Sequence, residues 1–254
     1  MSLAVEDLGV DFGGVAALGG VSFEVRPGTI TSLIGPNGAG KTTAFNAITG
    51  YLRPTRGRVT WEAQPITGRR PCDIARLGVV RTFQKTSVFP ALSVRVNVLT
   101  GLHLRGTATW LDVLLGRARV GAEEARLAGD AGEIIRFVGL EHRRDETASG
   151  LPYGEQRLLE LAVALAARPR MLLLDEPAAG MTGAEKARLM DLIRRVREQG
   201  VTVFIVEHDM RLVMSVSDTV IVLNHGRVIA EGPPARIQSH PDVIRAYLGT
   251  SAPA

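Results

Sequence analysis

The sequence predicts an α/β fold in which helices cover both faces of a largely parallel β-sheet. Three apolar runs of four to six residues, Met171–Leu174, Val201–Val206 and Val220–Leu223, are typical of strands buried on both faces. Helical patterns alternate with strands along the chain, at Lys41–Thr49 and Ala184–Gln199, and each is followed by a glycine that can end a helix. Strands and helices alternating in this order indicate a doubly wound α/β domain.

The first and middle parts of the chain add two features to this plan. Val21–Val25 and Thr29–Ile34 are rich in β-branched and apolar residues, and Pro27-Gly28 supplies a turn between them. From about Thr86 to Gly154 the alternation stops, because the sequence there is helical in pattern, most clearly at Glu123–Val138, and lacks a convincing buried strand. We therefore expect a helical subdomain inserted into the α/β core.

Composition places the chain among globular proteins. Its 254 residues are 45% hydrophobic and 22% charged, which excludes a disordered or collagen-like chain. The longest apolar stretch, Leu158–Ala167, contains Glu160 and is too short to cross a bilayer, and no signal peptide precedes Glu6. A single cysteine, Cys72, cannot form an internal disulfide. We expect a soluble, intracellular protein.

The charge pattern shows a marked preference for arginine over lysine. The net charge is +4, and of the 30 basic residues only Lys41, Lys85 and Lys186 are lysines. The small positive excess is typical of an arginine-rich proteome, and without a basic run longer than two residues it does not indicate a nucleic-acid partner. A lysine therefore needs a local explanation, and Lys41 has one.

A phosphate-binding motif lies between the strand at Thr29–Ile34 and the helix that begins at Lys41. Its residues are Gly35, Pro36, Asn37, Gly38, Ala39, Gly40, Lys41 and Thr42, which fit the pattern G-x-x-x-x-G-K-[ST]. The glycines let backbone N–H groups converge on phosphate oxygens at a helix N-terminus. Lys41 then places a positive charge on the β- and γ-phosphates, and the Thr42 hydroxyl ligates Mg²⁺. The motif predicts a nucleoside-triphosphate site rather than a simple glycine-rich turn.

Two carboxylates end the buried strand that begins at Met171. Asp175 and Glu176 follow the apolar run directly, at the edge where open α/β sheets bind ligands. Asp175 is predicted to hold the Mg²⁺ shell and Glu176 to orient the attacking water. The alternative is a turn that starts a helix, with Pro177 at its first position.

Two further polar residues follow predicted strands. His208 comes after Val201–Val206, where its imidazole could donate a hydrogen bond to the γ-phosphate, although it could also be an exposed loop histidine. Gln84 follows the strand-like Val79–Phe83 and could bind metal or water through its amide oxygen. We predict catalytic roles for Glu176, His208 and Lys41.

Together and in this order, these elements resemble the ATP-binding subunit of ABC transporters over nearly the whole chain. GPNGAGKTT resembles the Walker A loop, MLLLDE the Walker B strand, and LPYGEQ the signature motif that kinases and GTPases lack. Gln84 then matches the Q-loop glutamine, Ala178–Met181 the D-loop and His208 the switch histidine. The resemblance implies ATP and Mg²⁺ as cofactors, with ATP split into ADP and phosphate.

The resemblance also implies the remaining site residues and the fold. Phe12 matches the aromatic residue that stacks on adenine, although a core phenylalanine is the alternative reading, and Thr43 completes the phosphate loop. The implied fold is a P-loop NTPase, with a RecA-like parallel core, an N-terminal antiparallel β subdomain and an inserted helical subdomain. We expect core at residues 1–85, helical subdomain at 86–155, and core again at 156–254. The signature residues, which would meet ATP on a second subunit, are Leu151, Pro152, Tyr153, Gly154, Glu155 and Gln156.

Finer motifs resemble the branched-chain amino acid importer branch of this family. VVRTFQ, LPYGEQR, DEPAAGM, EHDM and PDVIRAYLG carry this resemblance, and urea-importer ATPases share several of them. It implies a second ATPase subunit, either a copy or a homologue, in an ATP-sandwich dimer. It also implies separate permease subunits, an extracytoplasmic solute-binding protein, and a peripheral position on the cytoplasmic face of the inner membrane.

Two other functions would use the same phosphate loop. A soluble ABC-type ATPase acting on ribosomes or DNA usually has tandem cassettes or long coiled-coil insertions, and this single chain has neither. A P-loop kinase would leave the signature and His208 unexplained.

The sequence departs from the family pattern at three positions. Pro152 stands where many members have a serine that caps a helix, so we expect the contacts to the second subunit's ATP to be retained but differently weighted. Leu158 and Val163 stand where the importer branch usually has arginine. These replacements put one or two ion pairs between the helical subdomain and the core in doubt.

Overall fold

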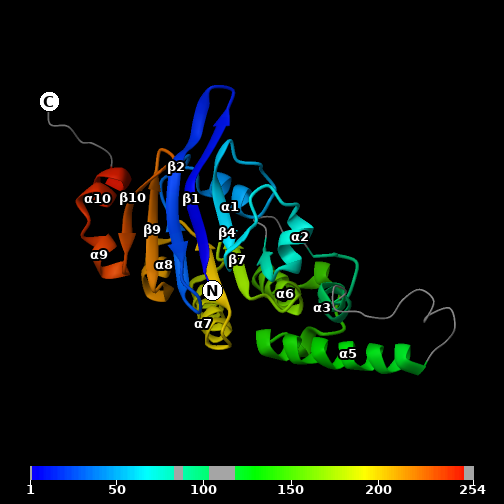
Figure 1. Ribbon diagram of the computed structural model, residues 1–254. Coiled ribbons are helices and arrows are strands. Elements are labelled where there is room, and N and C mark those ends of the chain that lie inside the picture. The colour runs from blue at the N-terminus through cyan, green and yellow to red at the C-terminus, as the bar shows by residue number, and fades with distance from the viewer. Residues whose placement is uncertain (1, 83–87, 103–117, 249–254) are drawn as a thin grey trace. The chain divides into compact units, whose positions relative to one another are not determined.

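The computed structural model describes residues 2–82, 88–102 and 118–248 (Figure 1). Strands and helices alternate through them, and the strands form two sheets, which confirms the predicted α/β class. By internal contacts the chain divides into two compact units. One contains Met1–Arg81, Arg170–Ala179 and Lys186–Ala254, and the other contains Thr82–Pro169 and Gly180–Glu185.

The larger unit contains a six-stranded sheet of order β10-β9-β3-β8-β7-β6. Neighbouring strands from β9 to β6 are parallel, and β10 pairs antiparallel with β9 at one edge. The three predicted buried strands are confirmed, since all five residues of β7 and of β8 are buried, as are the four middle residues of β9. The strands are β3 (Ile30–Ile34), β6 (Val79–Arg81), β7 (Met171–Asp175), β8 (Thr202–Val206), β9 (Thr219–Asn224) and β10 (Arg227–Gly232).

A four-stranded antiparallel sheet of order β2-β1-β4-β5 belongs to the same unit. Its strands are β1 (Leu3–Phe12), β2 (Val15–Val25), β4 (Arg56–Trp61) and β5 (Gln64–Pro65). From the residue pattern we expected only the end of β2. Strand β1 was not predicted, and Asp7 explains why. Its φ of 46° accompanies a register shift between Val5 and Leu8, which breaks the alternation of apolar residues.

A hydrophobic core lies between the two sheets, around helix α1 (Lys41–Ile48). Phe45 of α1 packs on Phe204 of β8 with ring centroids 5.0 Å apart, and Phe23 of β2 reaches the same ring at 5.6 Å. The opposite face of the six-stranded sheet forms a second core, because alternate residues of a strand point to opposite faces. The helices that contribute to this second core are α8 (Met210–Val216), α9 (Pro234–Gln238) and α10 (Pro241–Leu248).

Two further helices contribute to this unit, α2 (Pro71–Arg76) entirely and α7 (Gly183–Glu198) from Lys186 onward. Helix α2 precedes β6, and α7 matches the helix predicted at Ala184–Gln199. Helix α7 begins with a capping box, in which Glu185 accepts hydrogen bonds from the Thr182 N–H and hydroxyl, both at 2.8 Å. In the parts of the chain that the structure describes, none of the helices combines the length and apolarity needed to cross a membrane.

The smaller unit is helical, as predicted. It contains α3 (Val94–Leu102), α5 (Ala118–Val138) and α6 (Tyr153–Ala166), and two short 3₁₀ helices, η2 (Glu141–Arg143) and η3 (Ala148–Gly150), lie between α5 and α6. Helix α6 contacts both α3 and α5, so this unit continues through α6 to Pro169, past the boundary that we expected at residue 155. The signature residues therefore lie at the start of a helix that packs inside the helical unit.

Candidate nucleotide-binding site

The three predicted motifs of the core meet at one edge of the six-stranded sheet. Strands β3, β8 and β7 are neighbours and parallel, so the phosphate loop, His208 and the pair Asp175-Glu176 all follow carboxyl ends at the same edge. Asp175 pairs in register with Val206, two residues before His208. The fold thus brings together segments that are more than 160 residues apart in the sequence.

Two glycines give the phosphate loop its shape. A Cβ at Gly35 would lie 2.1 Å from the carbonyl oxygen of Leu223, so only glycine allows this approach of β9. Gly40 has a φ of 102°, and a Cβ there would lie 2.7 Å from the Leu18 side chain. The loop closes with a hydrogen bond from the Ala39 N–H to the Pro36 carbonyl at 3.1 Å, and α1 begins at Lys41. Its N–H groups stand at a helix N-terminus, which favours anions.

Lys41 is buried and lies across its own loop. Its Nζ donates to the carbonyl oxygens of Gly35 at 2.7 Å and Pro36 at 2.9 Å. Burial lowers the pKa of Lys41, whereas the negative charges of Glu176 and Asp175 act to raise it. Because its hydrogen-bond partners are neutral carbonyls, its charge is available to a phosphate group. Thr42, in the first turn of α1, is exposed, and Thr43 beside it is half-buried.

Phe12 lies at the end of β1, before the turn to Val15. Its side chain is 52% exposed, and that of Val15 is 69% exposed. The ring is therefore not a core phenylalanine, which was the alternative reading of this residue. Its predicted role in stacking on adenine stays a prediction.

Arg81 is a site residue that the sequence analysis did not single out. Its guanidinium donates to Oδ2 of Asp175 at 2.7 Å, and both side chains are only 6% exposed. It also donates to Asn46 at 2.7 Å and Thr49 at 3.0 Å, both on or next to α1. Arg81 thus joins the helix of the phosphate loop to the predicted Mg²⁺ ligand. The available signal was a charged residue ending a short apolar run at Val79.

Glu176 has an unusual backbone conformation. Its φ of 47° is left-handed, which for a residue other than glycine costs on the order of 1 kcal/mol and is typical of functional sites. Its N–H donates to the Val206 carbonyl at 2.9 Å, which fixes it next to β8. The Nδ1 atom of His208 lies 3.9 Å from Oε1 of Glu176. The two predicted catalytic side chains are therefore neighbours, and His208 is 60% exposed.

A second residue that the sequence did not reveal, Glu207, connects the segment of Glu176 with that of His208. It is 1% exposed, and its carboxylate accepts backbone hydrogen bonds from Ala178 at 3.0 Å and from His208 at 3.1 Å. Its signal in the sequence was a carboxylate directly after the buried run Val201–Val206.

In the helical unit, the signature residues surround the start of α6. Pro152 precedes the helix and makes no side-chain capping bond, as expected of proline, while Gln156 donates to the Leu151 carbonyl at 2.9 Å. A Cβ at Gly154 would lie 2.2 Å from Oε1 of Glu185, and one at Gly180 would lie 3.0 Å from the Tyr153 ring. Signature and D-loop residues are thus in direct contact within this unit.

Polar contacts around α6 include a buried ion pair of Arg157 with Glu160 at 2.7 Å. Arg157 also donates to the Tyr153 hydroxyl at 3.0 Å, and Glu155 pairs with Arg143 at 3.2 Å. Leu158, one of the departures from the family pattern, is buried as an apolar residue.

Gln84 lies outside the described residues, so its predicted role as a metal ligand stays a prediction.

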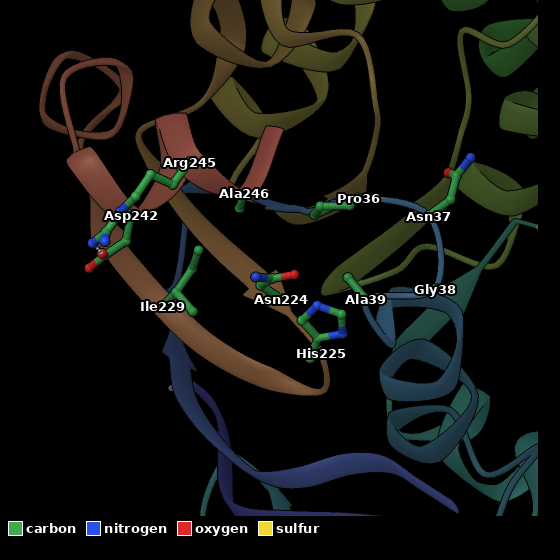
Figure 2. Close-up of a pocket in the computed structure, with 10 residues that line it drawn as sticks. All are labelled: Pro36, Asn37, Gly38, Ala39, Asn224, His225, Ile229, Asp242, Arg245 and Ala246. Carbon is green, nitrogen blue, oxygen red and sulfur yellow. Dashed lines mark hydrogen bonds and ion pairs between the residues drawn. The ribbon is translucent and has the colours of Figure 1, made fainter. Parts of the chain in front are cut away.

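A cavity of about 560 Å³ borders the phosphate loop on the side of α10 (Figure 2). Figure 2 shows Asn224 and His225 between the side chains of α10 and Ala39 of the loop. Tyr247 of α10 is close by, since the Gly35 backbone hydrogen-bonds its side chain. Burial raises the pKa of Tyr247 to about 12, although this hydrogen bond opposes the rise. The C-terminal helix is thereby linked to the first residue of the loop.

Comparisons with known proteins agree with this geometry. The family model of ABC transporters matches residues 18–179, and that of the branched-chain amino acid ATP-binding cassette transporters matches residues 227–253. The high-affinity branched-chain amino acid transport ATP-binding protein LivG of Salmonella typhimurium is 42% identical, as is BraF of Pseudomonas aeruginosa, which has the same description. Each match covers 97% of both chains.

A solved structure extends the likeness to the whole fold. The ADP conformation of MJ1267, an ATP-binding cassette of an ABC transporter, is 33% identical, with a TM-score of 0.86. The alignment covers 98% of this chain and 99% of that one. The predicted fold class, a P-loop NTPase core with an inserted helical subdomain, is confirmed.

Proposed function

Because this chain belongs to the ABC transporter family, as one of its ATP-binding subunits, we propose that it powers the uptake of branched-chain amino acids by an importer. The observation that carries the substrate class is the match of its C-terminal segment, residues 227–253, to the model of the branched-chain amino acid branch. The relatives named for this transport are 42% identical to it over nearly their whole length, which supports the same substrate class.

The phosphate loop holds the triphosphate of ATP. Backbone N–H groups of residues 37–42 and the Nζ of Lys41 contact the phosphate oxygens, and Phe12 stacks on the adenine. Asp175 and Thr42 offer a carboxylate and a hydroxyl oxygen, the hard ligands that Mg²⁺ prefers, so their chemistry fits this ion. Bound Mg²⁺ would supply positive charge to the phosphates, and Gln84 would add an amide oxygen. Arg81 keeps the Asp175 carboxylate in place.

Glu176 and His208 act on the reaction itself. The carboxylate of Glu176 orients and polarises the water that attacks the γ-phosphorus, and the products are ADP and phosphate. His208 donates a hydrogen bond to a γ-phosphate oxygen and stabilises the charge that develops there. Their separation of 3.9 Å supports this division of roles, since both side chains can reach one terminal phosphate group.

We further propose that two ATPase subunits enclose ATP between one phosphate loop and the other subunit's signature, Leu151–Gln156. The start of α6 suits this role because helix N-terminal N–H groups favour an anion, and Pro152 contributes no capping side chain. Closure of the dimer would move separate permease subunits, which receive solute from an extracytoplasmic binding protein. The chain would then lie on the cytoplasmic face of the inner membrane.

Uptake measurements test this function. Cells that lack the chain should lose most uptake of labelled leucine, isoleucine and valine, and the wild-type chain should restore it. The variant Glu176→Gln, produced at the same level, is the matched control and should not restore it. Restored uptake of urea without any effect on the three amino acids would contradict the proposed substrate.

A further inference from the structure

Glu207 is a buried carboxylate for which the proposed reaction has no use. It directly follows β8 and is 1% exposed, yet it faces two backbone donors from different segments. Oε1 accepts the Ala178 N–H at 3.0 Å, and Oε2 accepts the His208 N–H at 3.1 Å. A buried charge is costly unless it is paired or hydrogen-bonded, so these bonds are what allow a carboxylate here.

The two donors belong to the segments that carry the predicted catalytic side chains. Ala178 lies two residues after Glu176, and the neighbouring Ala179 N–H donates back to the Glu176 carbonyl at 3.2 Å, closing a turn. His208 itself provides the second donor. One carboxylate thus connects the turn of Glu176 to the loop of His208 across 29 residues of sequence.

The strained backbone of Glu176 shows why such a connection matters. A left-handed residue other than glycine persists only where surrounding contacts fix it. The bond from Ala178 to Glu207 is one such contact, and the bond from the Glu176 N–H to Val206 is another. Both lead to the end of β8, so the positions of Glu176 and His208 depend on the same few atoms.

An ion pair next to Glu207 also helps to hold the His208 loop in place. Lys186 donates to Asp209 at 2.8 Å, and Asp209 in turn accepts the N–H groups of Arg211 and Leu212 at the start of α8. The bond with Asp209 raises the pKa of Lys186, and the negative charge of Glu207 contributes to this shift. His208 Nδ1 also lies 3.8 Å from Oε2 of Glu207.

We propose that Glu207 is a positioning residue for ATP hydrolysis, which holds the Glu176 turn and the His208 loop at the spacing that the reaction needs. The proposal rests on the proposed ATPase function. It predicts an effect on the catalytic step rather than on ATP binding, because the hydrogen bonds of the Glu207 carboxylate go to the backbone of Ala178 and His208 and not to the phosphate loop.

The decisive variant is Glu207→Gln, tested in the full chain. Glutamine keeps the size of the side chain, but its NH₂ group must face one of the two backbone N–H donors. One hydrogen bond is therefore lost, and two N–H donors face each other without an acceptor between them. We expect kcat for ATP hydrolysis to fall roughly tenfold or more, with KM for MgATP within about twofold of wild type. Glu198→Gln, an exposed carboxylate at the end of α7, is the matched control and should change neither constant.

A double-mutant cycle with His208→Ala separates positioning from a general structural role. If Glu207 acts by setting the spacing between Glu176 and His208, the loss caused by Glu207→Gln should shrink to less than about threefold in the His208→Ala background, where this spacing no longer matters. An undiminished loss there, or a wild-type kcat in the single variant, would overturn the proposal. If Glu207→Gln does not fold, as judged by its melting curve, Glu207→Asp serves in the same cycle, because its shorter side chain cannot reach both donors. A wild-type chain without ATPase activity would instead contradict the proposed function.

Discussion

The ion pair of Arg81 with Asp175 gives the sharpest prediction about stability. We consider Arg81→Met, which keeps much of the side-chain volume and removes the guanidinium. The hydrogen bonds to Asp175, Asn46 and Thr49 are lost, as is the contact of the guanidinium with the Phe45 ring at 5.6 Å. More importantly, the Asp175 carboxylate stays buried at 6% exposure without this cation.

The expected cost follows from that uncompensated charge. Removing one partner of a buried ion pair costs about 3–5 kcal/mol of unfolding free energy, whereas removing an exposed one costs about 1 kcal/mol or less. In a chain of this size, a loss of 3–5 kcal/mol lowers the melting temperature by roughly 6–20 °C. Urea unfolding without nucleotide should therefore show a lower midpoint at an unchanged slope.

Two further variants make this measurement decisive. Arg211→Met removes an exposed arginine of α8 and should leave the midpoint within about 0.5 kcal/mol of wild type. Adding Asp175→Asn to Arg81→Met removes the buried charge and should recover part of the lost stability. A loss below 1 kcal/mol for Arg81→Met alone would refute the reasoning, since the pair would then behave as if it were exposed to solvent.

Three other predictions concern the phosphate loop and its neighbours. Lys41→Ala should weaken MgATP binding about 10- to 100-fold in calorimetry, because a charge-assisted contact to the phosphates is lost; unchanged binding would exclude the loop as the site. Glu176→Gln should bind MgATP normally, hydrolyse it at least about 100-fold more slowly and accumulate as ATP-bound dimers in size-exclusion chromatography, whereas near-normal turnover would remove Glu176 from catalysis. In an absorbance titration after a rapid pH jump, one tyrosine should ionise near pH 12, and Tyr247→Phe should abolish that step. Because the folded chain keeps this proton between pH 10 and 12 and the unfolded chain loses it, stability should fall as the pH rises through that window, and less so in Tyr247→Phe.

The sequence was sufficient for the strands and helices that place the motifs, for identifiable reasons. Continuous apolar runs such as Met171–Leu174 have few alternatives to a buried strand, and the glycines after Lys41–Thr49 and Ala184–Gln199 mark where helices end. Strand β1 could not be predicted in the same way, since the bulge at Asp7 places Glu6 and Asp7 in the middle of its apolar pattern. The extent of the helical unit was also missed, because whether α6 packs on α3 and α5 or on the core is decided by tertiary contacts.

The candidate site shows the same limit. The phosphate loop and the Asp175-Glu176 pair are local motifs, so spacing along the chain was enough to find them. Arg81 and Glu207 act through partners 94 and 29 residues away, and these pairings depend on the order of β6, β7 and β8 in the sheet. The sequence shows that Arg81 and Glu207 are charged residues at the ends of buried strands, but it does not show which residues they contact.

The four carboxylates at this sheet edge should therefore fail in different ways when they are changed. Asp175 is paired with Arg81 and Asp209 with Lys186, whereas Glu207 binds backbone N–H groups. Glu176 has a left-handed backbone, and its carboxylate lies beside His208. Loss of a partner of Asp175 should thus lower stability, loss of Glu207 should lower kcat with little effect on KM, and loss of the Glu176 carboxylate should stop hydrolysis while the fold and ATP binding persist. If all these variants instead lost stability and turnover in proportion, the edge would be one structural cluster, and the separate roles argued from these contacts would be wrong.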